Sequence, residues 1–259
     1  MTDAEDRAER EQDNEAPKVV GMGRRRPLSP IPRETLHDRV YAELRRSLIH
    51  GVFATGETLR IQELAEKLQT STMPVREALA RLVSEQALEA LPNRSVRVPV
   101  ISREKLEDLA RARTLIEGQI VALALPNLTD ADFERLRQLA AQCESAFRGQ
   151  DSDRARITSE LNHAFHYYIY RAARSSVLIP IIESLWLQSG PYVQAAASLH
   201  EEQRDLPGAH HHWALIEAME RGDEAGAIKA LTDDISRSFN LVRARLDAED
   251  AEKKAANDG

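Results

Sequence analysis

The stretch E-L-A-E-K-L-Q-T-S-T-M-P-V-R-E-A-L-A-R-L, from Glu63 to Leu82, decides how the N-terminal part of the chain folds. It holds two apolar stripes at helical spacing, Leu64, Ala65 and Leu68 in the first and Val75, Ala78, Leu79 and Leu82 in the second. The polar residues 69–72 can continue neither stripe. Pro74 falls in the first turn of the second helix, where a missing N–H removes no helical hydrogen bond. The stretch therefore predicts a helix-turn-helix, whose second helix is presented to the major groove of DNA.

The same residues resemble the GntR family of bacterial regulators, whose pattern at this point is roughly S-R-T-P-V-R-E-A-L. The chain keeps the residues from Pro74 to Leu79. It departs from the pattern at Thr72, where the family usually has Arg, and at Met73, where the family usually has Thr. The resemblance extends over nearly all of the chain past residue 33. It implies a transcription regulator whose C-terminal domain senses a small molecule.

The composition favours a helical protein without disulfides. Aromatic residues make up 5% of the 259 residues, whereas the helix-favouring Ala, Leu, Glu and Arg are plentiful. The single cysteine, Cys143, cannot form an internal disulfide and indicates a reducing compartment. No apolar run approaches the roughly 20 residues that span a bilayer, and the acidic N-terminus lacks the apolar core of a signal peptide. We therefore expect a soluble cytoplasmic protein that has no membrane partner.

The net charge of −7 is unusual for a DNA-binding protein, but the charges are unevenly distributed. Residues 18–102 carry 14 basic and 9 acidic side chains, whereas residues 103–259 carry 19 basic and 26 acidic ones. The helix-turn-helix lies in the positive segment. An acidic C-terminal half would repel phosphate and keep bound DNA on one face of the protein.

The segments around the helix-turn-helix predict a winged helix over residues 34–101. An amphipathic helix is expected from Leu36 to Ile49. Two short strands are expected at Ala87–Leu91 and Val96–Val100, joined by a turn with a cationic tip. Residues 1–33 lack periodicity and contain several prolines, so we expect a disordered arm there. The arginines at 24–26 either reach the DNA backbone or belong to a solvated tail.

From Ser102 onward the sequence has helical patterns and no further strand signal. We expect an antiparallel bundle of six or seven helices over residues 102–248, and a disordered tail over residues 249–259. A helix that begins near Val177 is expected to be interrupted at Gly190-Pro191. The chain is thus predicted to be mainly α. The bundle is similar to the C-terminal domain of the FadR-like branch of GntR regulators, often called FCD, which implies effector binding and dimerisation.

The recognition helix has one cation in its first turn, Arg76, the best candidate for a paired hydrogen bond to guanine O6 and N7. Such a contact discriminates between bases by roughly 1–3 kcal/mol. Ser71 and Thr72 sit at the turn, where hydroxyls and N–H groups can hold a phosphate. Met73 either touches a thymine methyl or packs internally. Secondary candidates for DNA contact are Arg60, Gln62, Asn93 and Arg94.

In the bundle, the string L-N-H-A-F-H-Y-Y-I-Y places Asn162 and His166 four residues apart, on one helical face. In many FCD domains the corresponding four positions carry Asp, His, His and His, which coordinate a divalent metal. The resemblance here implies the set Asn162, His166, His212 and Asp234, with the first and last ligand types changed. Imidazole suits zinc, nickel, copper or iron. The alternative is that both histidines are polar pocket residues without a metal.

The resemblance also implies residues that bind the effector. Arg113, in R-T-L-I-E, matches an arginine that faces the effector cavity of FCD domains, where it could anchor a carboxylate with paired hydrogen bonds. The alternative is a pair with Glu117, four residues on. Trp213 either walls the cavity or packs in the core. The candidates for effector binding are Arg113, Asn162, His166, His212 and Trp213.

Two functions are consistent with these patterns. The first is a transcription regulator that acts as a homodimer on a two-fold DNA operator. It responds to a small, carboxylate-bearing metabolite, and repression is favoured over activation. The second is a metal-dependent hydrolase that uses the His/Asp set of the bundle. Against the hydrolase, the sequence contains no nucleophile elbow, phosphate loop or H-E-x-x-H helix. We therefore expect a regulator rather than an enzyme.

Overall fold

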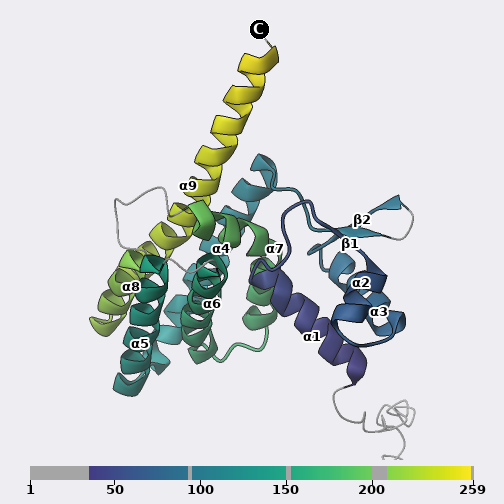
Figure 1. The fold of residues 1–259 in the computed structure, drawn as a ribbon. Coiled ribbons are helices and arrows are strands. Elements are labelled where there is room, and N and C mark those ends of the chain that lie inside the picture. The colour runs from purple at the N-terminus through teal and green to yellow at the C-terminus, as the bar shows by residue number, and fades with distance from the viewer. Residues whose placement is uncertain (1–34, 93–94, 150–152, 200–208, 258–259) are drawn as a thin grey trace, which may run out of the picture. The chain divides into compact units, whose positions relative to one another are not determined.

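The computed structural model describes residues 35–92, 95–149, 153–199 and 209–257, and these are mainly helical (Figure 1). Three helices form the N-terminal module together with a small sheet. They are α1 (Leu36–Ile49), α2 (Ile61–Lys67) and α3 (Thr72–Ser84). The arm predicted over residues 1–33 lies outside the described residues. None of the described helices is both long enough and apolar enough to cross a membrane.

The core of this module forms as the apolar stripes predict. Val75, Leu79 and Leu82 of α3 are at most 2% exposed, and they pack with Leu44 and Leu48 of α1. The α2–α3 turn passes through Gln69, whose φ of 51° lies in the left-handed region and reverses the chain within a few residues. The helix-turn-helix fold is therefore confirmed. The N-terminus of α1 is fixed by a capping box between Thr35 and Asp38.

A three-stranded antiparallel sheet completes the module. Its strands are β1 (Thr58–Leu59), β2 (Glu89–Ala90) and β3 (Val96–Arg97), in the order β1-β3-β2. The two predicted strands are shorter than expected, because Ala87 and Leu88 are buried in the core before the strand begins. Strand β1 has two residues, too few to show an alternating pattern in the sequence.

The C-terminal part forms a helical bundle, and six α-helices are found in its described residues. They are α4 (Arg103–Ala124), α5 (Asp130–Arg148), α6 (Arg154–Ala172), α7 (Leu178–Leu199), α8 (His210–Glu220) and α9 (Glu224–Asn257). A short 3-10 turn, η2 (Leu125–Asn127), follows α4 at Pro126. Large side chains such as Phe165, Trp186 and Phe239 fill the core between the helices.

Two predicted boundaries in the bundle are wrong. Helix α7 continues through Gly190-Pro191, because this part of the helix is buried and its packing outweighs the local preference. Helix α9 extends to Asn257, beyond the tail boundary predicted at residue 249. Its last turns are rich in Ala, Glu and Lys, which favour helix, and Arg245 pairs with Glu249 at 2.8 Å. Arg103 on α4 also holds Asp247 at 2.5 Å.

Candidate functional site

The outward face of α3 carries the side chains predicted to read DNA. The inward face of this helix is buried, so Thr72, Met73 and Arg76 project away from the core. Met73 is 55% exposed, which excludes internal packing for this apolar side chain. The described residues offer Arg76 no ion-pair partner, and its guanidinium stays available for a ligand.

The other predicted DNA contacts come from the start of α2, from the turn before α3 and from the predicted wing. Ser71 is the N-cap residue of α3, and its hydroxyl makes no capping hydrogen bond. A shallow hollow between α2 and α3 is lined by Gln62, Ser71 and Thr72. Arg60 is exposed and pairs with Glu63 at 3.0 Å, so that a phosphate would have to compete with this carboxylate. The predicted wing residues Asn93 and Arg94 lie outside the described part of the chain.

Four polar side chains from three helices meet inside the bundle, and we call them the His/Asp cluster: Asn162 and His166 of α6, His212 of α8 and Asp234 of α9. His166 Nε2 lies 3.1 Å from Oδ2 of Asp234. His212 Nε2 lies 3.0 Å from Oδ1 of Asn162 and 3.9 Å from Oδ1 of Asp234. The structure thus brings together the four residues that the family resemblance implies.

Burial controls the charges of this cluster. It lowers the pKa of His212 to about 3, so this imidazole is neutral at physiological pH. Burial alone would raise the pKa of Asp234, but the hydrogen bond with His166 and the electrostatic interactions with the nearby imidazoles, which are protonated only at acidic pH, outweigh burial and lower it. A neutral imidazole next to an ionised carboxylate is the protonation state that metal ligation requires.

The donor atoms of the cluster fit a small divalent metal. The candidate ligand atoms of His166, His212 and Asp234 all lie within 4.8 Å of one another. Ligands at about 2.0–2.1 Å around tetrahedral zinc are about 3.3 Å apart, close to the 3.0–3.9 Å spacings found here. The hydrogen bonding of the other imidazole nitrogen, Nδ1, fits a metal site less well. Nδ1 of His166 and Nδ1 of His212 are buried without a hydrogen-bond partner among the described residues, whereas a ligating imidazole usually donates its other N–H to an acceptor.

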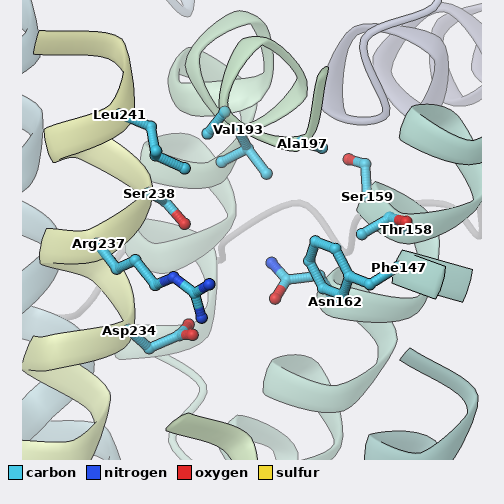
Figure 2. Close-up of a pocket in the computed structure, with 11 residues that line it drawn as sticks. Phe147, Thr158, Ser159, Asn162, Val193, Ala197, Asp234, Arg237, Ser238 and Leu241 are labelled. Atoms are coloured by element: carbon cyan, nitrogen blue, oxygen red, sulfur yellow. The ribbon is translucent and has the colours of Figure 1, made fainter. Parts of the chain in front are cut away.

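A cavity opens beside the His/Asp cluster, bounded by α5, α6, α7 and α9 (Figure 2). The volume open to water-sized groups is about 40 Å³, and the surrounding space is partly open to solvent. Asn162 faces Asp234 and Arg237 across the cavity, and Val193 and Ala197 of α7 border it (Figure 2). The cavity therefore combines an apolar wall with charged and amide groups of the cluster.

Four polar residues of this cavity were not predicted from the sequence: Thr158, Ser159, Arg237 and Ser238. Arg237 lies three residues after Asp234 on α9, and this spacing on a helical face could have identified it. Thr158 Oγ1 and Ser159 Oγ are buried and have no hydrogen-bond partner among the described residues. Buried hydroxyls are nearly always paired, so these two indicate polar groups of a ligand or water in the cavity.

The structure places Arg113 and Trp213 away from this cavity. Arg113 forms the alternative pair, with its Nε 2.6 Å from Oε1 of Glu117, and both side chains are buried. Trp213 donates from Nε1 to Glu144 on α5 at 3.1 Å. His166 and His212 do not line the cavity either, so Asn162 is the one predicted effector-binding residue on its wall among the described residues.

Two family models match the chain. The model of the gntR family of bacterial regulatory proteins matches residues 36–98, and the FCD domain model matches residues 108–237. The two matches correspond to the helix-turn-helix module and to most of the helical bundle.

Relatives cover most of the chain. The transcriptional regulator McbR of Escherichia coli (strain K12) is 30% identical over 207 residues, which cover 79% of this chain and 91% of McbR. The repressor RspR of the same organism is 26% identical over 215 residues, covering 82% and 92%. A probable repressor of a D-xylose utilization operon in Paenarthrobacter nicotinovorans is 26% identical over 215 residues, covering 80% and 88%.

A solved structure of E. coli McbR/YncC superposes with a TM-score of 0.73 at 28% identity, covering 83% of this chain and all of that one. The fold, both family models and the relatives therefore agree. The chain belongs to the GntR family of bacterial transcription regulators, in the branch that carries an FCD domain.

Proposed function

We propose that this chain is a repressor that binds a two-fold operator as a homodimer and whose operator affinity depends on a small carboxylate in the bundle cavity. Residues 34–101 would bind DNA, and residues 102–248 would bind the effector and the second subunit. The names of two relatives, both repressors, support repression. The relatives are regulators, so we do not propose the hydrolase alternative.

One observation carries the effector assignment. The hydroxyls of Thr158 and Ser159, which have no hydrogen-bond partner in the described part of the chain, line the same cavity as the guanidinium of Arg237. Two hydroxyl donors and a cation suit the two oxygens of a carboxylate. Asp234 lies beside Arg237 in this cavity (Figure 2), so a bound carboxylate would share the Arg237 guanidinium with Asp234. The apolar side of the cavity, at Val193 and Ala197, would contact the carbon skeleton.

The His/Asp cluster supports a metal as part of the same site. His166 and His212 would ligate through Nε2, Asp234 through its carboxylate and Asn162 through Oδ1. A bound divalent metal would supply positive charge to the effector's anionic group. The neutral Asn162 and the unpaired Nδ1 atoms of both histidines predict weaker metal binding than in relatives that have Asp at the first position.

On DNA, Arg76 would read guanine, Met73 would contact a thymine methyl, and Ser71 and Thr72 would hold a phosphate. The exposed face of α3 supports these roles. Gln62, Arg60, Asn93 and Arg94 would add contacts at the rim. An effector changes operator affinity only by the difference in its own affinity for the DNA-binding and the non-binding states.

The test begins with an operator selected by the protein from random duplex DNA. A panel of small mono- and dicarboxylates is then screened by thermal shift, and operator affinity is measured by fluorescence anisotropy with and without each stabilising compound. We expect at least one compound to weaken operator binding about tenfold, within the usual range of allosteric coupling. Thr158→Val with Ser159→Ala should abolish this response. A compound that binds at the cavity and leaves operator affinity unchanged would contradict the proposal.

A further inference from the structure

The C-terminal end of α1, in the DNA-binding module, is in direct contact with the bundle. A Cβ at Gly190 of α7 would lie 2.2 Å from the carbonyl oxygen of Leu48, so the two backbones touch and only glycine fits. A Cβ at Gly51 would lie 2.3 Å from Cβ of Gln194, also on α7. A displacement of α7 at this point therefore reaches α1 without a flexible side chain between them.

Side chains of α1 and α7 add an apolar contact and an ion pair to this backbone contact. Leu187 of α7 is 1% exposed and belongs to the apolar core of the helix-turn-helix module. Arg45 of α1 pairs with Glu183 of α7 at 3.3 Å. An open groove lined by Arg45, His50, His163 and Glu183 lies beside this contact, so the close packing is confined to the backbone at Gly190 and to the Leu187 side chain. The DNA-binding module therefore contacts α7 directly at this end of α1, and we call this the α1–α7 contact.

A series of aromatic rings joins the α1–α7 contact to the His/Asp cluster. His50, the C-cap residue of α1, meets His163 of α6 edge-on, with ring centroids 5.3 Å apart. His163 meets Trp186 of α7 at 5.2 Å, and Trp186 meets His166 at 5.7 Å. His163 also stacks on Tyr167 at 4.2 Å. Two rings, His163 and Trp186, therefore separate a cluster residue from the end of α1.

His163 has no other assigned role. Its Nε2 is buried without a hydrogen-bond partner among the described residues, as is Nδ1 of His50. Neither histidine belongs to the His/Asp cluster. Both rings are therefore held in place by packing rather than by hydrogen bonds through these nitrogens. The rings are thus placed where they contact both the sensing helix and the DNA-binding module.

We propose that His163 is a positioning residue that makes operator binding depend on the occupant of the His/Asp cluster, by holding the C-terminal end of α1 against α6. This inference rests on the proposed function. A ligand bound at His166 would fix the position of this ring, and the constraint would pass through Trp186 and His163 to His50. The His163 side chain would affect the coupling between the two sites and would leave binding at each site nearly unchanged.

The test uses the full chain stripped of metal with EDTA, the selected operator, and Zn²⁺ alone as the probe. Operator affinity is measured with and without Zn²⁺, and Zn²⁺ affinity is measured by calorimetry. In the unaltered protein we expect Zn²⁺ to change operator affinity about fivefold or more. His163→Ala should bring this ratio close to one while Zn²⁺ affinity stays within about twofold. His163→Phe keeps the ring contact and should restore the ratio.

Two controls separate coupling from general damage. His210→Ala removes an exposed histidine of α8 and should leave the ratio unchanged. His50→Ala should have the effect of His163→Ala, and the double variant should be no worse, because the two rings act as one contact. Hydrogen exchange gives a readout that needs no DNA, since Zn²⁺ should protect the amides of residues 48–52 in the unaltered protein only.

The outcomes distinguish the inference from the function on which it rests. If Zn²⁺ leaves the operator affinity of the unaltered protein unchanged, both the metal-dependent regulation and this inference are wrong. If Zn²⁺ changes that affinity equally in the unaltered protein and in folded His163→Ala, the regulation stands and the inference is overturned. Loss of Zn²⁺ binding in His163→Phe would also overturn it, because His163 would then be part of the site.

Discussion

Arg113 and Glu117 form an ion pair in the core of the bundle, with Nε and Nη2 of Arg113 lying 2.6 and 3.2 Å from the two carboxylate oxygens of Glu117. The two side chains are 4% and 0% exposed. Tyr170 donates its hydroxyl to the same carboxylate, and the guanidinium lies over the Trp186 ring at 4.2 Å. Each charge is therefore fully partnered, as a buried ion pair must be.

Removing one member of this pair should be far more costly than removing both. Arg113→Ala leaves the Glu117 charge buried without a partner and should lower the free energy of unfolding by about 3–5 kcal/mol. Urea unfolding followed by circular dichroism measures this loss. Arg111→Ala, which removes an exposed pair with Asp108, is the matched control and should cost at most about 0.5 kcal/mol.

If Arg113→Ala fails to fold, a variant with apolar side chains in place of Arg113, Glu117 and the Tyr170 hydroxyl tests the same energetic argument. Arg113→Met with Glu117→Met and Tyr170→Phe leaves no buried charge and should recover most of the lost stability. If Arg113→Ala is instead as stable as the unaltered protein and no longer responds to its effector, Arg113 belongs to the effector site.

The sequence predicts best where a helical spacing and a chemical role coincide. Asn162 and His166 share a face of α6 because they are four residues apart, and the structure brings both to His212 and Asp234. The stripe of Val75 and Leu79 likewise predicts which face of α3 is buried. The periodicity of one helix gives the shared face of Asn162 and His166 and the buried face of α3, whereas His212 and Asp234 were implied by the family resemblance.

The failures come from contacts between distant parts of the chain. Gly190 reads as a helix breaker, yet its lack of a side chain permits the contact with Leu48. From the sequence, Arg113 can pair either with an effector carboxylate or with Glu117. The packing around Glu117 in the folded bundle selects the second. Trp213 is adjacent to His212 but faces α5, where Glu144 accepts its N–H. Such choices depend on three-dimensional neighbours that a single sequence does not specify.

Restoring a carboxylate at the first position of the cluster should strengthen metal binding. Asn162 Oδ1 lies 3.0 Å from His212 Nε2, within reach of a shared ion. Asn162→Asp adds a negative charge there, and we expect Zn²⁺ affinity to rise by about tenfold or more, comparable to other changes around a metal. Calorimetry with metal-free protein measures the change, and Asn162→Leu should reduce affinity. Equal Zn²⁺ affinity in all three proteins would place the metal elsewhere.

Stability should fall at mildly acidic pH because of buried neutral histidines. Burial lowers the pKa of His163 to about 3, from 6.5 in the unfolded chain. As the pH falls below 6.5 the unfolded chain binds a proton first, so the free energy of unfolding decreases, until both states are protonated below about 3. Between pH 7 and pH 5 the loss should be about 2 kcal/mol from His163, and His212 should add a similar loss.

His163→Phe isolates one of these contributions. Urea unfolding at pH 7 and pH 5 should show about 2 kcal/mol less acid sensitivity in this variant than in the unaltered protein. His210→Phe, on the exposed side of α8, is the control for replacing a histidine by a ring. An identical pH dependence in His163→Phe and the unaltered protein would mean that His163 is protonated or solvated in the native state.

The central claim is that the exposed face of α3 reads the operator, with Arg76 as its base-reading cation. The most direct test compares Arg76→Ala with the unaltered protein for affinity to the selected operator and to a scrambled duplex, at one fixed salt concentration. Loss of a paired contact to guanine should lower the ratio of the two affinities by roughly 5–150-fold, equivalent to about 1–3 kcal/mol, and should relax the preference at one base pair of each half-site. An Arg76→Ala protein that keeps the full ratio would contradict the account.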